Sequence, residues 1–237
     1  MTRKAFSPAG HLAPLVACFA FALVGVAKAD VVPIPIFNTG VNASGTVLAD
    51  GTIGDPHYSL VAVPGGTTDI LVRTSAGGFP IGPYIADDSL SAWIGPNGDA
   101  QLDGPAGLFD YQTTFNLAGF DPLTASLTFS WATDNAGFDV LINGVSTGAS
   151  IPYGSDGAYS FQNWSGPITI GNGFVAGINT LDFIVQNTSG PTALRVEISG
   201  TAAQVPEPSS LAQLFMQFGI VLVVAFGANK ARQILNA

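Results

Sequence analysis

The chain has little cysteine and little positive charge. Its one cysteine, Cys18, lies in an apolar run near the N-terminus, so the residues after this run can form no disulfide, thiol nucleophile or cysteine-ligated zinc site. Between Asp30 and Gln204 there are two basic residues, Arg73 and Arg195, and fifteen acidic ones, which gives this region a net charge of −13. Phosphate binding needs clustered basic side chains, and we therefore expect no nucleic-acid partner.

The N-terminus has the pattern of a secretory signal peptide. Arg3 and Lys4 precede an apolar run at 12–26, and this run ends in Ala27-Lys28-Ala29. A positive start, an apolar stretch and small residues at the cleavage site are typical of such leaders. We predict that residues 1–29 form a signal helix, that cleavage follows Ala29 with Ala27 as the other small recognition residue, and that export uses the Sec route.

The C-terminus has the pattern of a membrane anchor. Residues 211–227 are apolar apart from two glutamines, and their length is near the lower limit for a helix that crosses a bilayer. Lys230 and Arg232 follow, and basic residues beyond an apolar span favour the cytoplasmic side. We predict a linker at 201–210 and a transmembrane helix with a basic tail at 211–237. The main domain would then face the periplasm from the inner membrane.

The end of the chain also carries a short motif that an ordinary anchor does not need. It consists of Val205, Pro206, Glu207 and Pro208 before the apolar segment, and of Lys230 and Arg232 after it. This order resembles the PEP-CTERM sorting signal of Gram-negative bacteria. The resemblance implies an exosortase that processes the tail, a final place at the cell surface or in the extracellular matrix, and exopolysaccharide as a partner. A plain C-terminal anchor is the alternative.

The region between the two ends favours β-structure. It is rich in glycine, threonine, serine and asparagine, and apolar residues alternate with polar ones. The alternation is clearest at 109–117, 125–131, 181–185 and 194–198, and Asn143-Gly144 is a strong hairpin signal after 138–142. Weaker strand candidates are 58–63, 69–74, 90–94 and 168–170, and the small residues from Ile198 to Val205 indicate an exit from the last strand. We predict an all-β domain, a β-sandwich, at 30–200.

A set of residues in this domain resembles a known kind of sandwich. In galactose-binding-domain-like jelly rolls, a Trp-x-x-Asp-Asn hairpin precedes a strand that ends in Asn-Gly. The matching residues here are Trp131, Asp134, Asn135, Asn143 and Gly144. The resemblance implies a jelly-roll topology, with an immunoglobulin-like sandwich as the alternative.

Two sets of residues are candidates for binding. Aromatic and short polar side chains in a glycine-rich stretch suit a sugar, because aromatic faces pack on sugar C–H groups; these residues are Tyr153, Asp156, Tyr159, Asn163 and Trp164. Trp131 lies on an apolar strand face and is expected in the core. Loop carboxylates suit calcium, and the resemblance to jelly rolls raises this expectation; the candidate ligands are Asp50, Asp55, Asp99, Asp103 and Asp134. Their spacing matches no EF-hand.

Catalytic residues are harder to find. His57 has no nucleophile-elbow motif to serve, and Glu197 is the one glutamate of the domain that a glycosidase would need beside an aspartate. We therefore predict that the protein is not an enzyme but an exported envelope or biofilm-matrix protein. A carbohydrate-binding module with a structural calcium is the alternative, and a secreted hydrolase is the least supported one.

Overall fold

The computed structural model describes residues 29–65, 68–77, 84–96, 104–155 and 158–205, together with Gly219. The chain divides into two units, and every element below belongs to the unit Ala29–Pro206. The predicted signal peptide up to residue 28, Pro206, Glu207, Pro208, Lys230 and Arg232 lie outside the described residues. Within the described part of the chain, no helix is both long and apolar enough to span a bilayer.

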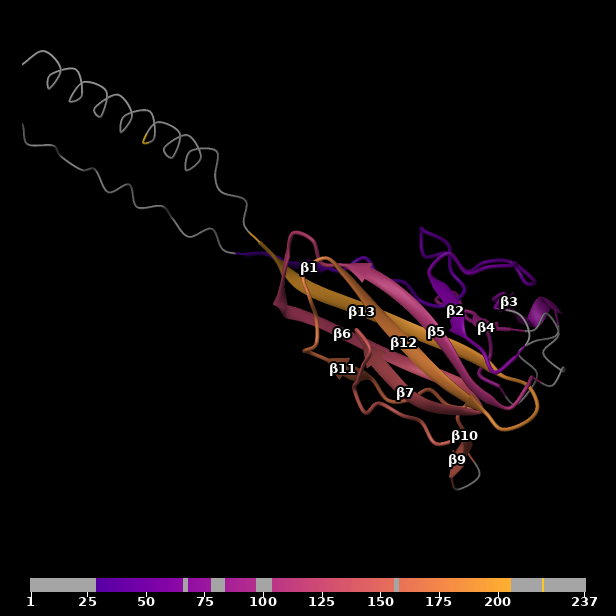
Figure 1. The fold of residues 1–237 in the computed structure, drawn as a ribbon. Coiled ribbons are helices and arrows are strands. Elements are labelled where there is room, and N and C mark those ends of the chain that lie inside the picture. Colours follow the sequence, from indigo (N-terminus) through magenta and orange to yellow (C-terminus); the bar gives the residue numbers. More distant parts are fainter. Residues whose placement is uncertain are drawn as a thin grey trace, which may run out of the picture. The chain divides into compact units, whose positions relative to one another are not determined.

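The unit is an all-β sandwich of two antiparallel sheets (Figure 1), as the alternation of apolar and polar residues predicts. One sheet has the order β11(Ile168–Ile170), β6(Phe120–Asp134), β13(Ala193–Gln204), β4(Trp93–Gly95) and β3(Leu71–Arg73), with β1(Val31–Pro33) paired to β13. The other has the order β2(Tyr58–Ala62), β5(Gly107–Asn116), β12(Ile178–Asn187), β7(Ala136–Ile142) and β8(Val145–Ser146). A small hairpin, β9(Gly154–Ser155) and β10(Ala158–Tyr159), projects from the loop between β8 and β11.

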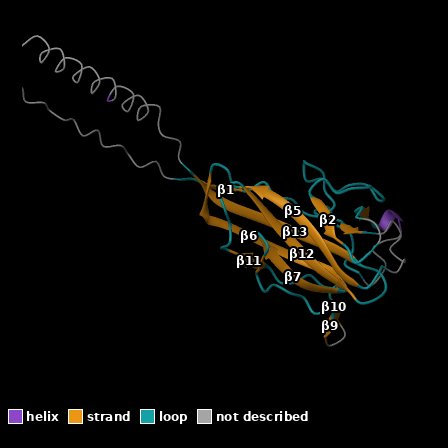
Figure 2. Ribbon diagram, viewed as in Figure 1, coloured by secondary structure: helices purple, strands orange, loops and turns teal. Residues whose placement is uncertain are grey.

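The four longest strands, β5, β6, β12 and β13, alternate between the two sheets in chain order. β5, β7 and β12 lie in one sheet, while β6 and β13 lie in the other, and loops connect them across the ends of the sandwich (Figure 2). Each long strand therefore turns one face toward the opposite sheet, which explains its period of two.

The core lies between the sheets and is built by the side chains that the alternation places inward. Phe183 of β12 is at its centre, with ring centroids 5.4 Å from Phe129 and 5.6 Å from Trp131, both in β6. These three side chains are at most 1% exposed. Burial of a large apolar side chain contributes roughly 1.5–3 kcal/mol, so such contacts hold a domain that has no disulfide.

The Asn143-Gly144 hairpin is confirmed. Both residues have positive φ, 51° and 77°, as a two-residue turn between β7 and β8 requires.

The expected exit from the last strand after Ile198 is wrong. β13 continues to Gln204, pairs with β6 as far as Phe120, and pairs with β1 on its other side. Gly200 is required because packing is tight there: a Cβ at this position would lie 2.5 Å from Cδ2 of the buried Leu127. The strand therefore passes the predicted domain boundary at residue 200.

Gly137→Ala is expected to destabilise the domain by about 1–3 kcal/mol, the usual cost of overpacking a core. A Cβ at this position of β7 would lie 2.5 Å from the buried ring of Trp131 in the other sheet. Urea unfolding measures the change in the free energy of unfolding. Gly166→Ala is the matched control because its Cβ would have no atom within 4 Å, and a comparable loss in both variants would contradict the explanation.

Candidate functional site

Two of the predicted sugar-binding residues come together at the end of the sandwich. Tyr153 precedes β9 and Tyr159 ends β10, and their ring centroids are 5.2 Å apart at an angle of 45°. Tyr153 is 39% exposed and Tyr159 is 41% exposed. We call these two residues the tyrosine pair. The hairpin thus presents two aromatic rings to solvent side by side.

Further aromatic rings support the tyrosine pair from below. Phe161 stacks on Tyr159 with ring centroids 5.2 Å apart and an angle of 5°. Tyr84, which comes from a distant segment, stacks on Phe161 at 4.4 Å. No pattern in the sequence indicates a role for Tyr84, because nearly seventy residues separate it from Tyr153 and only the fold brings them together.

A carboxylate lies beneath these rings. The Tyr84 hydroxyl donates to Oδ2 of Asp134, and Nδ2 of Asn135 donates to its Oδ1 at 2.7 Å. Burial raises the pKa of Asp134 to about 6, against the two hydrogen bonds that lower it. Asp134 therefore carries a negative charge at neutral pH. Burial, together with the nearby charge of Asp134, raises the pKa of Tyr153.

Asp134 and Asn135 form a layer of polar groups beneath the rings, which we call the polar floor, and Asn135 fixes its position. Its Oδ1 accepts hydrogen bonds from the backbone N–H of Thr188 at 2.7 Å and from the Thr188 hydroxyl at 3.1 Å. Its backbone carbonyl accepts one from the Ser160 hydroxyl, which lies next to Phe161. Asp134 and Asn135 belong to the Trp-x-x-Asp-Asn sequence named above. They thus connect the ends of β6 and β7 to the aromatic site.

The other predicted sugar-binding residues are placed differently. Trp164 is half-buried and covers a guanidinium group, with Cζ of Arg195 5.1 Å from its ring centroid. Asn163 is exposed, and Asp156 lies outside the described residues. The structure therefore separates Trp164, whose ring covers a buried cation, from the exposed tyrosine pair.

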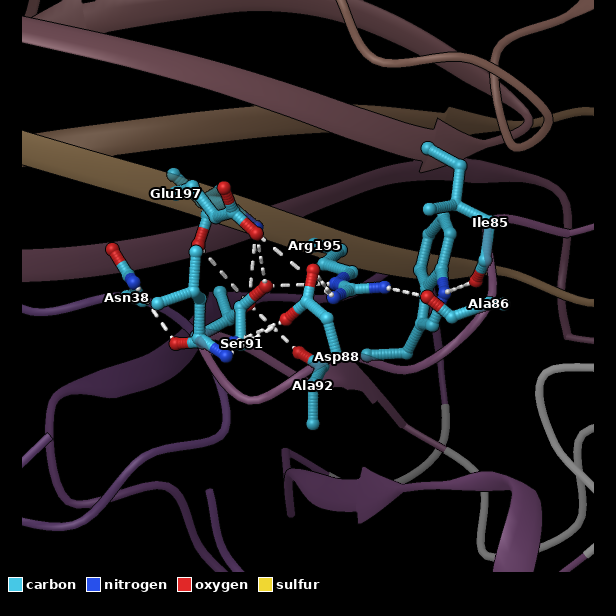
Figure 3. A network of polar contacts seen from close by, with 12 residues as sticks. Asn38, Ile85, Ala86, Asp88, Ser91, Ala92, Arg195 and Glu197 are labelled. Carbon is cyan, nitrogen blue, oxygen red and sulfur yellow. Dashed lines mark hydrogen bonds and ion pairs between the residues drawn. The ribbon is translucent and has the colours of Figure 1, made fainter. Parts of the chain in front are cut away.

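Arg195 is the centre of a polar network that the sequence analysis missed (Figure 3). Its side chain is fully buried on the face of β13 that points away from the core. Nε donates to the Ser91 hydroxyl at 2.8 Å, one terminal nitrogen donates to the carbonyl of Ala86 at 2.7 Å, and the other forms an ion pair with Asp88 at 2.8 Å. A single arginine in an apolar strand was the signal available in the sequence.

This network fixes the segment 84–92, which we call the strap, on the outer face of the sheet. The strap is held at its other end by the backbone N–H of Ile85, which donates to the carbonyl of Phe161 at 2.9 Å. The carbonyl of Ile85 accepts a hydrogen bond from the indole N–H of Trp93 at 3.1 Å. Because Tyr84 begins the strap, the contacts of Arg195 help to hold Tyr84 under the tyrosine pair.

Glu197, the candidate acid of a glycosidase, belongs to the same network. Its Oε1 accepts a hydrogen bond from the Ser91 hydroxyl at 3.0 Å and lies 3.9 Å from a terminal nitrogen of Arg195, which also pairs with Asp88. Burial raises the pKa of Glu197, and the neighbouring Asp88 adds to the effect. Burial tends to raise the pKa of Asp88, but the hydrogen bond from the backbone N–H of Leu90 and the charge of Arg195 outweigh it, so that the pKa is lowered.

The geometry of this carboxyl pair is not that of a glycosidase. Glu197 lines a shallow depression of about 260 Å³ together with Asn38, Thr128, Ser130 and Ser199. Glycoside hydrolysis uses two carboxyl groups about 5 Å or more apart, with the sugar between them. Here one terminal nitrogen of the buried Arg195 lies against both groups, 2.8 Å from Asp88 and 3.9 Å from Glu197. His57, the other catalytic candidate, stacks on Phe37 with ring centroids 3.8 Å apart.

The calcium candidates bond to different parts of the protein. Asp50 pairs with Arg73 at 3.6 Å, and Asp55 accepts hydrogen bonds from the backbone N–H groups of Gly40, His57 and Tyr58. Asp134 bonds to Tyr84 and Asn135. Asp99 and Asp103 lie outside the described residues. Among the described residues, no three acidic, histidine or cysteine side chains gather as a set of metal ligands.

Glu197→Gln is expected to change how stability depends on pH. Because the folded protein raises the pKa of Glu197 above its ordinary 4.5, the stabilisation from its protonated form is present below that value. It is lost as the pH rises through the raised pKa. The charged groups that face Glu197 are Asp88 and Arg195. Urea unfolding of both proteins from about pH 4 to about pH 8 should show the wild type losing stability relative to the variant. A wild type that gains stability relative to the variant as the pH rises would contradict this assignment.

Comparisons with known proteins give no family for the chain. No family model matches it, and no curated protein matches it. A solved structure, CBM35 from Paenibacillus barcinonensis, is similar at 20% sequence identity and a TM-score of 0.31, and the match covers 62% of this chain and 98% of that chain.

Proposed function

We propose that this chain is an exported envelope or biofilm-matrix protein whose β-sandwich is a non-catalytic, glycan-binding module. The observation that carries the binding role is the tyrosine pair, two exposed and mutually contacting rings above a hydrogen-bonded polar floor. The jelly-roll topology of the galactose-binding type is part of the proposal, as are anchoring by a PEP-CTERM tail and processing by an exosortase. Exopolysaccharide or a surface glycan is the proposed partner.

The tyrosine pair has the features that a sugar platform needs. Aromatic faces pack on the C–H groups of a sugar ring, and tyrosine hydroxyls can bond to its hydroxyl groups. The stack on Phe161 and Tyr84 holds Tyr159 from below. Because the rings are already ordered by these contacts, little side-chain entropy is lost when a ligand binds.

The proposed location is supported by the two ends of the sequence. The leader pattern at 1–29 predicts export, and the apolar segment at 211–227 with Lys230 and Arg232 after it predicts retention at the inner membrane. The motif Pro206-Glu207-Pro208 lies directly after Val205, the first residue beyond β13. Two prolines keep the chain out of a strand, which suits a peptidase that needs an unpaired backbone.

Tyr159→Ala is expected to weaken glycan binding about tenfold, since loss of one stacking ring costs roughly 1–1.5 kcal/mol. The measurement is a glycan array followed by titration calorimetry on the best ligand, with and without EDTA to test for calcium. Phe138→Ala is the matched control because Phe138 is also an exposed aromatic residue, but on β7. Binding that survives in the Tyr159 variant, or that falls equally in the control, would contradict the platform.

Fractionation of the native host, with intact mass of the recovered protein, tests the location. We expect the mature chain to begin at Asp30 and to leave the inner membrane once its tail is removed. Glu207→Ala is expected to leave the protein in the membrane fraction with its tail attached. Recovery of the full-length chain in the cytosol would overturn the export proposal.

A further inference from the structure

The described residues of the sandwich present no exposed basic side chain to solvent. In the part of the chain that the structure describes, the basic side chains are those of Arg73 and Arg195, which are 8% and 0% exposed. Arg73 pairs with Asp50, and Arg195 pairs with Asp88 and Glu197. Four aspartates are exposed to solvent, Asp30, Asp69, Asp87 and Asp88, and of these Asp88 is the partner of Arg195. The described surface therefore creates a negative potential that no exposed basic side chain offsets.

The same sign of charge lies under the tyrosine pair. The carboxylate of Asp134 is within electrostatic reach of Tyr153 and accepts a hydrogen bond from Tyr84. Neither of its partners, the Tyr84 hydroxyl and the Asn135 amide, carries a positive charge. A ligand on the tyrosine pair thus meets aromatic faces with a buried, uncompensated negative charge behind them.

We propose that the tyrosine pair selects a polysaccharide that carries free amino groups. The inference rests on the glycan-binding function proposed above and narrows its ligand class. A protonated amine on a sugar ring is attracted to the electron-rich face of tyrosine and to the carboxylate behind it. An anionic polysaccharide, such as one built from uronic acids, would be repelled by the acidic surface and would find no basic side chain on the described surface.

A matched pair of probes tests the charge preference. Soluble oligomers of β-1,4-linked glucosamine and of N-acetylglucosamine share one backbone and differ in whether the amine is free. Binding is measured by titration calorimetry at about pH 6.5, where Asp134, with its pKa of about 6, is mostly ionised. We expect the free-amine oligomer to bind about tenfold more tightly, and its affinity to fall between ~0.05 M and ~0.5 M salt.

Asp134→Asn isolates the contribution of the buried charge. The amide keeps the shape of the side chain and can still bond to Tyr84 and Asn135, so thermal unfolding is expected to show a folded domain. We expect the preference for the free amine to fall about threefold to tenfold. Asp121→Asn is the control: Asp121 lies near the other end of the same strand, roughly 40 Å away at about 3.3 Å per residue.

The outcomes separate this inference from the proposed function. Equal binding of both oligomers, or tighter binding of the N-acetylated one, overturns the amine preference while the glycan-binding role stands. Tight binding to a uronic-acid polymer in the same buffer also overturns it. If the wild type prefers the free-amine oligomer and Tyr159→Ala binds neither oligomer, the result supports the amine preference of the tyrosine pair. Absence of binding to any glycan removes the proposed function itself.

Discussion

Burial of the Arg195 guanidinium is the constraint on which the rest of this end of the molecule depends. A buried charge is costly unless it is paired and hydrogen-bonded. Ser91, Asp88 and the carbonyl of Ala86 meet this need, and all three belong to the strap. The ring of Trp164 covers the same group. Since Tyr84 begins the strap and stacks on Phe161, compensation of one buried cation also determines where the aromatic support of the tyrosine pair can lie.

The same pairing shapes the electrostatics of the surface. Arg195 pairs with Asp88 at 2.8 Å and lies 3.9 Å from Glu197, and burial together with the neighbouring charge of Asp88 raises the pKa of Glu197. Arg73 is similarly engaged by Asp50. Both arginines of the domain are therefore used inside the structure. The sequence has an excess of acidic residues, and the described part of the surface has no exposed basic group to balance them. Such a surface favours neutral or cationic partners over anionic ones.

The sequence predicted the strands and the core well, but it predicted only part of the candidate site. Alternation at 109–117 and 125–131 identifies inward-facing residues because a strand exposes its two faces in turn. The end of β13 was missed because small residues such as Gly200 resemble a linker, although a side chain at Gly200 would collide with Leu127. Tyr153 and Tyr159 were found because they lie close together in one glycine-rich loop. Tyr84 and Arg195 could not be assigned, since the hydrogen bonds from Tyr84 to Asp134 and from Arg195 to Ala86 join residues that are 50 and 109 positions apart.

The acids of this domain differ in what they bond to, and this difference distinguishes structural from functional roles. Asp55 bonds to three backbone N–H groups, and Asp121 bonds to the backbone N–H of Leu123, as is typical of aspartates in turns. Glu197 is engaged by Ser91 and Asp88. Asp134 bonds instead to the side chains of Tyr84 and Asn135, and both of these belong to the aromatic site. Asp134 is thus a buried carboxylate that is satisfied by uncharged side chains and connected to the exposed Tyr159 through the stacked rings of Tyr84 and Phe161, and its charge is left for a ligand to meet.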